Sequence, residues 1–149
     1  MSREIRITLF VLSFVIMFTA CERHIISPLP DTDLEEILNI QWALQSFRTD
    51  HQVVLPPEDQ PYTITFETDS TFSGRADCNE IFGNYFAKAD QSMRVKRIGT
   101  TYVYCGENSM DDRYLKALSS VNSFSVRESR LFLKYGKNSS LVFRKNVQK

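Results

Sequence analysis

Apolar residues alternate with polar residues along several short stretches of the chain, the pattern of β-strands with one buried face. The clearest example is residues 40–45, where Ile40, Trp42 and Leu44 share one face. Turn-forming residues such as Thr68-Asp69-Ser70 separate consecutive stretches and favour hairpins. The predicted strands cover residues 40–45, 62–67, 71–74, 84–89, 93–98, 101–105, 124–127, 130–135 and 140–144. Those at 84–89 and 93–98 are weaker, so we expect about seven to eight strands.

A helical period interrupts the alternation twice. A short helix is predicted from Thr32, where Glu35 completes a capping box. A longer helix follows Asn108 or Ser109 as its cap and carries the acidic pair 111–112 at its positive end. Its apolar stripe consists of Tyr114, Leu115, Leu118 and Val121. Many strands in hairpin order with one substantial helix predict a mainly β fold, a small antiparallel barrel-like sheet that curls or closes.

The N-terminal segment has the layout of an export signal. Arg3 and Arg6 precede an apolar run over residues 7–20, which is shorter than the ~20 residues that a membrane-spanning helix needs. A cleavable signal is therefore favoured over the alternative of a transmembrane anchor. The run ends in Phe-Thr-Ala-Cys, which resembles the bacterial lipobox and implies lipidation of Cys21. The expected organisation is a signal peptide over residues 1–20, a lipidated tether over 21–30 and one domain over 31–149.

Charge and position then bear on partners and location. The chain carries 18 basic and 18 acidic side chains, a balance that gives no electrostatic case for nucleic acid. It also argues against a polybasic membrane patch, so attachment to the membrane would rest on the lipid. Glu22 is not the aspartate associated with inner-membrane retention in enteric bacteria. We expect a monomer, lipid-anchored in the bacterial cell envelope, with the outer membrane favoured.

The remaining cysteines form an even pair. Cys78 and Cys105 belong to an exported chain, so a disulfide is expected, and closing its loop of ~28 residues would stabilise the fold by roughly 3–4 kcal/mol. A catalytic cysteine would need a base, yet the two histidines, His24 and His51, fall in the tether and in a predicted loop. The cysteine spacing does not match a zinc site, and the acidic pair suits helix capping. We expect no catalytic residue, no metal and no cofactor, and therefore no enzyme.

The densest group of distinctive residues lies between 72 and 85. Gly74 and Gly83 mark places where the backbone needs positive φ or a close approach, and Asn79 suits a turn. We expect a strand that leaves the sheet, a tight irregular crossing held by the disulfide, and a strand that re-enters.

This arrangement resembles the META domain, the family of the HslJ-like heat-shock lipoproteins, over about residues 40–143. The resemblance is carried by Trp42, Leu44, Gly74, Cys78, Asn79, Gly83, Thr100, Thr101 and Cys105, the helix around 115–121 and the Leu-Val-Phe finish. Asp77 stands where the family commonly has a small residue, so the geometry of that turn is left open. The resemblance implies a small β-barrel-like domain on a bacterial envelope protein, linked to stress tolerance and without established catalytic chemistry.

Aromatic residues gather around the motif, namely Phe72, Phe82, Tyr85, Phe86, Tyr102 and Tyr104. Small barrels are usually packed solid, so we expect core filling, although a small ligand is the alternative. Exposure of Tyr102 and Tyr104 would instead indicate a binding surface. The preferred function is a non-enzymatic lipoprotein that supports stress or drug tolerance by binding an envelope component or protein. The alternative is a lipocalin-like carrier of a small apolar ligand, or an inhibitor of a secreted hydrolase that presents a loop such as 52–60.

Overall fold

The computed structural model describes residues 32–146, which lie in the second of two units, residues 31–149. The predicted signal peptide, Cys21 and the tether fall outside the described residues. The elements are α2 (Thr32–Ile37), β1 (Gln41–Arg48), β2 (Val53–Val54), β3 (Tyr62–Phe66), β4 (Thr71–Ala76), β5 (Asn79–Ala87), β6 (Met93–Thr100), α3 (Asp111–Ser119), β7 (Val121–Arg127), β8 (Arg130–Tyr135) and β9 (Ser139–Lys145). Among these residues, neither helix is long and apolar enough to cross a bilayer.

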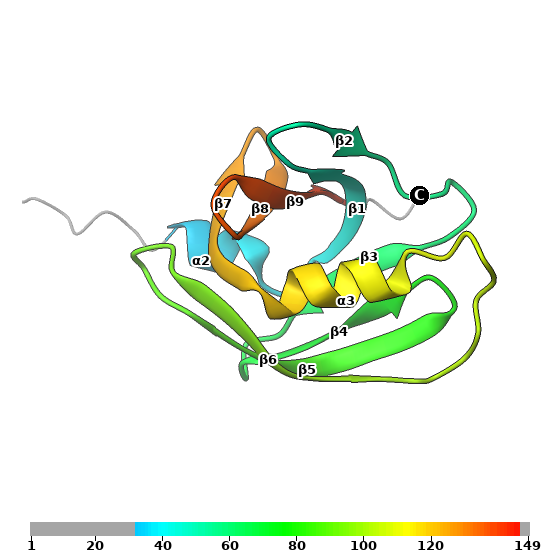
Figure 1. Ribbon diagram of the computed structural model, residues 1–149. Coiled ribbons are helices and arrows are strands. Elements are labelled where there is room, and N and C mark those ends of the chain that lie inside the picture. The colour runs from blue at the N-terminus through cyan, green and yellow to red at the C-terminus, as the bar shows by residue number, and fades with distance from the viewer. Residues whose placement is uncertain (1–31, 147–149) are drawn as a thin grey trace, which may run out of the picture. The chain divides into compact units, whose positions relative to one another are not determined.

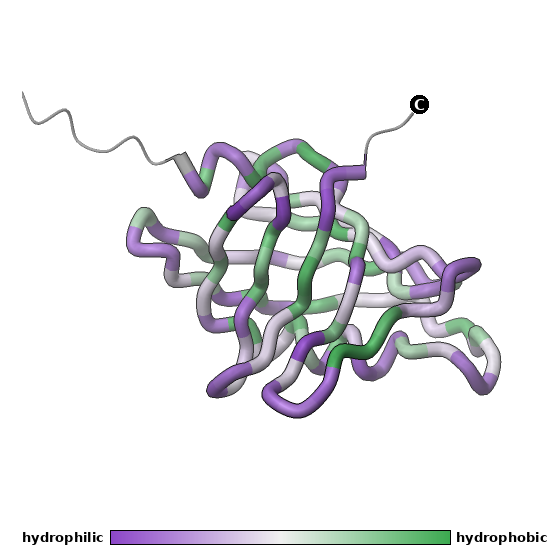
Figure 2. Tube along the Cα trace, turned by 90° about the horizontal axis from the view of Figure 1, so that it is seen from above, coloured by the Kyte–Doolittle hydropathy of each residue, from purple (hydrophilic) through white to green (hydrophobic). Residues whose placement is uncertain are grey.

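All strands belong to one antiparallel sheet. Its order is β6-β5-β4-β3-β1-β9-β8-β7, with β2 paired to β1. Figure 2 shows these strands side by side in a curled sheet. The two terminal strands meet at one point, where the N–H of Phe124 donates to the carbonyl of Gln91 (2.9 Å) beside an isolated bridge between Ser92 and Ser123. The sheet is thus an incomplete barrel, and the predicted fold class is confirmed.

Helix α3 and large apolar side chains fill the concave side of the sheet. α3 contacts β4, β6 and β8, so it lies between the two halves of the sheet (Figure 1). Its Tyr114 is fully buried and donates its hydroxyl to the carbonyl of Thr63 (3.2 Å). Trp42, fully buried on β1, donates Nε1 to the carbonyl of Ile37 (3.1 Å) and so attaches α2 to the sheet. The interior is packed by side chains, each contributing about 1.5–3 kcal/mol through burial.

The segment 72–85 is a regular hairpin and not the irregular crossing that we expected. β4 and β5 are paired without interruption up to Ala76 and Asn79, so Asp77 and Cys78 form a two-residue turn. Asp77 takes φ 61°, a conformation that glycine adopts more easily than aspartate. Gly74 allows the backbones of β4 and β3 to approach each other closely, because a Cβ at this position would lie 2.1 Å from the carbonyl oxygen of Thr63.

Three further expectations are corrected. Residues 101–105 form no strand: Ile81 pairs with Thr100, and β5 begins only two residues earlier, so almost no partner strand remains beyond Thr100. The N-cap of α3 is Met110, whose side chain makes no cap bond, and not Asn108 or Ser109, although the hydroxyl oxygen of Ser109 accepts the N–H of Asp111 (3.3 Å), the first residue of the helix. The helix ends at Ser119. Val121 is therefore the first residue of β7 and not part of the helical stripe.

Candidate functional site

The segment 101–106, which we call the braced segment, leaves the sheet after β6 and exposes its aromatic side chains. Tyr102 is 96 % exposed and Tyr104 is 81 % exposed, and Val103 between them is also exposed. Solvent exposure of two large aromatic side chains this close in sequence indicates a binding surface and not the core filling that we expected.

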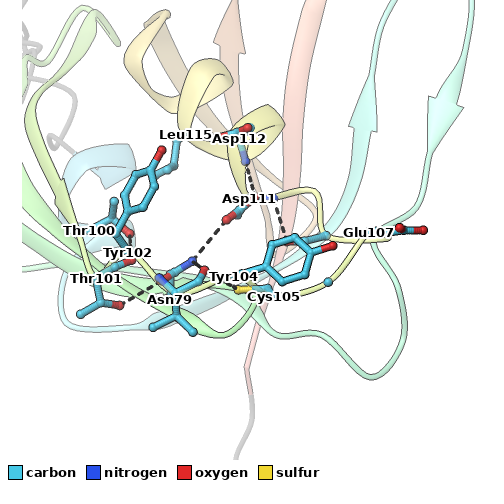
Figure 3. Close-up of a pocket in the computed structure, with 13 residues that line it drawn as sticks. Asn79, Thr100, Thr101, Tyr102, Tyr104, Cys105, Glu107, Asp111, Asp112 and Leu115 are labelled. Carbon is cyan, nitrogen blue, oxygen red and sulfur yellow. Dashed lines mark hydrogen bonds between the residues drawn. The ribbon is translucent and has the colours of Figure 1, made fainter.

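Asn79, only 3 % exposed at the start of β5, holds the backbone of this segment. Its Oδ1 accepts the N–H of Val103 (2.8 Å) and the hydroxyl of Thr101 (3.2 Å). Its Nδ2 donates to the carbonyl of Val103 (3.0 Å), to Sγ of Cys105 (3.2 Å) and to Oδ2 of Asp111 (3.2 Å). In Figure 3 the Asn79 side chain accordingly lies between Thr101 and Asp111. One amide thus replaces the missing partner strand for Val103.

Covalent and backbone links complete the bracing. Cys78 and Cys105 form the predicted disulfide, with their Cα atoms 5.6 Å apart. The N–H of Thr101 donates to the carbonyl of Glu80 (3.1 Å), and the N–H of Glu80 donates to the hydroxyl of Thr101 (2.9 Å). Both ends of the braced segment are therefore fixed to the β4–β5 turn.

The residues that carry the resemblance to the META domain fall into two groups by their position in the fold. Asn79, Thr100, Thr101 and the disulfide meet at the braced segment. Trp42, Gly74 and Gly83 do not belong to it: Trp42 lies in the core, and the two glycines permit close packing within the sheet. A Cβ at Gly83 would lie 2.7 Å from a ring carbon of Phe72.

The N-terminus of α3 forms the other wall of the site. Asp111 accepts Nδ2 of Asn79 at Oδ2 and the N–H of Asp112 (2.8 Å) at Oδ1. The hydroxyl oxygen of Tyr62 accepts the N–H of Met110 (2.8 Å), and burial raises the pKa of Tyr62 above its ordinary value. The Tyr62 hydroxyl positions the segment that leads into α3.

A cavity of about 490 Å³ lies between the braced segment and α3. Its lining combines the exposed tyrosines with acidic side chains from Glu107, Asp111 and Asp112 and the apolar side chain of Leu115. Such a surface can accept hydrogen bonds and attract cations. Within residues 32–146, no three His, Cys, Asp or Glu side chains are grouped so as to hold a metal ion.

The aromatic cluster expected to fill the core is split. Phe72 and Tyr85 are buried, and Tyr85 donates its hydroxyl to the carbonyl of Glu67 (2.7 Å). Phe82 and Phe86 are exposed on the outer face of β5, as are Tyr102 and Tyr104 on the braced segment. The alternation along β5 indicates this exposure, because Phe82 and Phe86 lie an even number of residues from the exposed Glu80 and therefore on the same face of the strand.

The fold and the site define a class of protein: a curled antiparallel β-sheet with a helix packed inside it and a disulfide-braced segment at one end. Residues 34–148 match the family model of the META domain, so the chain belongs to the META domain family. No curated protein matches this chain significantly.

Solved structures of other proteins share the fold. An NMR structure of a protein from Burkholderia xenovorans has a TM-score of 0.68 at 20 % identity, covering 79 % of this chain and 89 % of that one. A crystal structure of a DUF4847 family protein from Bacteroides vulgatus has a TM-score of 0.57 at 18 % identity, covering 77 % and 98 %. At these identities the similarity concerns the fold alone.

Proposed function

We propose that this chain is a non-enzymatic lipoprotein of the bacterial envelope, favouring the outer membrane, that binds a partner protein through the braced segment. One observation carries the proposal: Tyr102 and Tyr104 are exposed on a backbone that the buried Asn79 and the disulfide hold in place. The bracing stabilises the domain and at the same time keeps both tyrosines on an ordered, solvent-facing backbone, where they can contact a partner.

Exposed tyrosines on a fixed backbone are well suited to binding. Tyrosine supplies a large amphipathic contact area at low cost in conformational entropy, and it is enriched among the residues that dominate binding energy. A backbone that is already ordered avoids part of the entropy loss on association. The nearby acidic residues Glu107, Asp111 and Asp112 add negative charge. The matching partner has an apolar cleft for the two rings and a basic rim.

Capture with the purified domain as bait tests this proposal. We expect a partner to be retained by the wild type and lost with the double variant Tyr102→Ala/Tyr104→Ala. Phe86→Ala is the control for loss of an exposed aromatic ring outside the braced segment, because Phe86 is 65 % exposed on β5. Isothermal titration with the purified partner should give a loss of about 2 kcal/mol or more for the double variant. Equal retention by the wild type and the double variant would refute the proposal.

Lipid attachment and stress tolerance are supported by the lipobox-like sequence before Cys21 and by membership of the META domain family. Labelling cells with a palmitate analogue should mark the wild type and not Cys21→Ser. Deletion of the gene should change tolerance to heat or to envelope-acting drugs, and complementation with Cys21→Ser should not restore it. Unchanged tolerance across such a panel would contradict this part of the proposal.

An inhibitor of a secreted hydrolase is the second candidate, because a braced segment with projecting side chains also fits an active-site cleft. It predicts that the captured partner is a hydrolase whose activity returns with Tyr102→Ala/Tyr104→Ala. The loop 52–60 is a weaker choice: of its two exposed large apolar residues, Val53 is held by pairing of β2 with β1, whereas Leu55 has no comparable bracing among the hydrogen bonds of the described residues. A lipocalin-like carrier would have to displace packed core residues such as Tyr114 and Phe143.

A further inference from the structure

The outer face of the β5–β6 hairpin combines exposed aromatic rings with positive charge. Phe82 is 57 % exposed and Phe86 is 65 % exposed, and both lie on β5. Arg94, Lys96 and Arg97 are exposed on the neighbouring β6. We call these five residues the cationic face. The balanced charge of the whole chain gave no indication of this local concentration.

The register of the hairpin brings the cations next to the rings. Phe86 pairs with Arg94, and Asn84 pairs with Lys96. The pairing shifts between Phe82 and Asn84, and Arg97 takes φ 53° at this bulge. The bulge leaves a cavity of about 390 Å³ lined by Asn84, Phe86, Lys96 and Arg97. Two cations, an amide and an aromatic ring therefore surround one space on the surface.

No other charged side chain of the hairpin lines this cavity, although the neighbouring β3–β4 turn holds an acidic side chain nearby: Thr71, the register partner of Asn84, donates its hydroxyl to Oδ1 of Asp69 (2.6 Å). Asp90 lies at the hairpin tip, where its Oδ1 accepts the N–H of Ser92 (2.9 Å), and Lys88 stands beside it. Glu80 lies at the opposite end of β5, where it is the register partner of Arg75 on β4. Among the residues that line the cavity there is no acidic side chain.

The tip of the hairpin that carries the cationic face contacts the start of α2. At the tip of the same hairpin, Nε2 of Gln91 donates to Oδ2 of Asp33 (2.9 Å), near the start of α2. Ten residues, 22–31, connect Cys21 to this helix. They span at most about 33–36 Å when fully extended. A lipid on Cys21 would therefore keep the hairpin tip within reach of the bilayer surface.

We propose that the cationic face binds the anionic phospholipid surface of the membrane that holds the lipid anchor. Lys96 and Arg97 donate hydrogen bonds to lipid phosphate oxygens, and the amide of Asn84 provides a further donor. Phe86 inserts its ring at the boundary between headgroups and acyl chains. The orientation of the domain rests on the proposed lipidation of Cys21, whereas the binding itself does not require it.

Vesicle co-sedimentation of residues 22–149 tests the proposal without a lipid anchor. This piece contains the whole unit 31–149 and its buried core. We expect binding to vesicles of phosphatidylcholine with phosphatidylglycerol, little binding to phosphatidylcholine alone, and weakening by salt. Each cation near an anionic surface contributes about fivefold in affinity, or about 1 kcal/mol, so Lys96→Gln/Arg97→Gln should bind about 25-fold more weakly.

Matched variants separate the cationic face from charge in general. Arg130→Gln/Lys134→Gln removes two exposed cations from β8 and should change binding by less than twofold. Phe86→Ala should weaken binding to the vesicles while leaving the dependence of that binding on phosphatidylglycerol unchanged. Circular dichroism verifies that each variant is folded. If Lys96→Gln/Arg97→Gln does not fold, Arg94→Gln provides a second test of the cationic face.

Three results would overturn the proposal: binding that does not depend on phosphatidylglycerol, equal losses in the β6 and β8 variants, or full competition by inorganic phosphate at the same charge concentration. The last would identify a site for free phosphate and not for a membrane surface. A mature protein without acyl groups would contradict the proposed function and leave this vesicle result unaffected.

Discussion

Replacing Asn79 by alanine removes the side chain on which the braced segment depends most. The amide makes five hydrogen bonds, and the two shortest join it to Val103, at 2.8 Å from the N–H and 3.0 Å to the carbonyl. A typical hydrogen bond contributes about 1 kcal/mol net. Val103 is exposed, so water recovers part of the loss at its backbone. We therefore expect Asn79→Ala to destabilise the domain by about 2–3 kcal/mol, equivalent to a Tm lower by about 6–15 °C.

Thermal and urea unfolding followed by circular dichroism measure the stability change. Hydrogen exchange measures the local effect, because the N–H of Val103 donates to Oδ1 of Asn79. In Asn79→Ala this amide should exchange roughly fivefold faster or more, the factor that corresponds to about 1 kcal/mol for one hydrogen bond.

Asn122→Ala is the matched control. Asn122 is exposed and donates Nδ2 to the carbonyl of Gly136 (3.3 Å), so its loss should change stability by less than about 0.5 kcal/mol. The reasoning is refuted if Asn79→Ala is no less stable than Asn122→Ala, or if exchange at Val103 is the same in both variants.

Further predictions concern the disulfide, the core and pH. Cys78→Ala/Cys105→Ala should lose roughly 3–4 kcal/mol in urea unfolding, and reductant should destabilise the wild type but not this variant. Tyr114→Phe should cost about 0.5–1.5 kcal/mol by the same assay, since the hydroxyl is buried and hydrogen-bonded. Gly74→Ala should cost about 1–3 kcal/mol, measured as a lower Tm, because the new Cβ meets backbone. Burial raises the pKa of Tyr62 and, further, that of Tyr114, so their contribution to stability is complete below about pH 10 and is lost as pH rises through the folded-state pKa. Unfolding titrations at about pH 9 and pH 11 should show this loss, and Tyr114→Phe should reduce it.

The sequence predicted most of the sheet because its signals are local. Alternation at Trp42 and Leu44 gave the buried face of β1, and the turn residues before Thr71 gave the β3–β4 hairpin. The pairing of Cys78 with Cys105 followed from their being the two cysteines left after Cys21. These inferences needed no knowledge of which strand lies next to which.

Other features depended on tertiary context. Residues 101–105 alternate like a strand, but β5 begins at Asn79 and offers almost no residues to pair with them. The side chain of Asn79 instead accepts the N–H of Val103. By its hydrophobicity, Val121 fits the apolar stripe of a helix and a buried strand position equally well, and the structure places it at the start of β7. The cationic face is formed only when the register places Arg94 and Lys96 beside Phe86 and Asn84, which no count of charges along the chain reveals.

Photo-crosslinking in living cells tests the central claim most directly, that the braced segment is where a partner protein binds. A photoreactive amino acid is placed at Tyr102, and for comparison at the exposed Lys134 on β8. The account predicts one discrete cross-linked species from position 102 that is absent from position 134 and is lost when Asn79→Ala is introduced. No cross-linked species at position 102, or the same species from both positions, would contradict it.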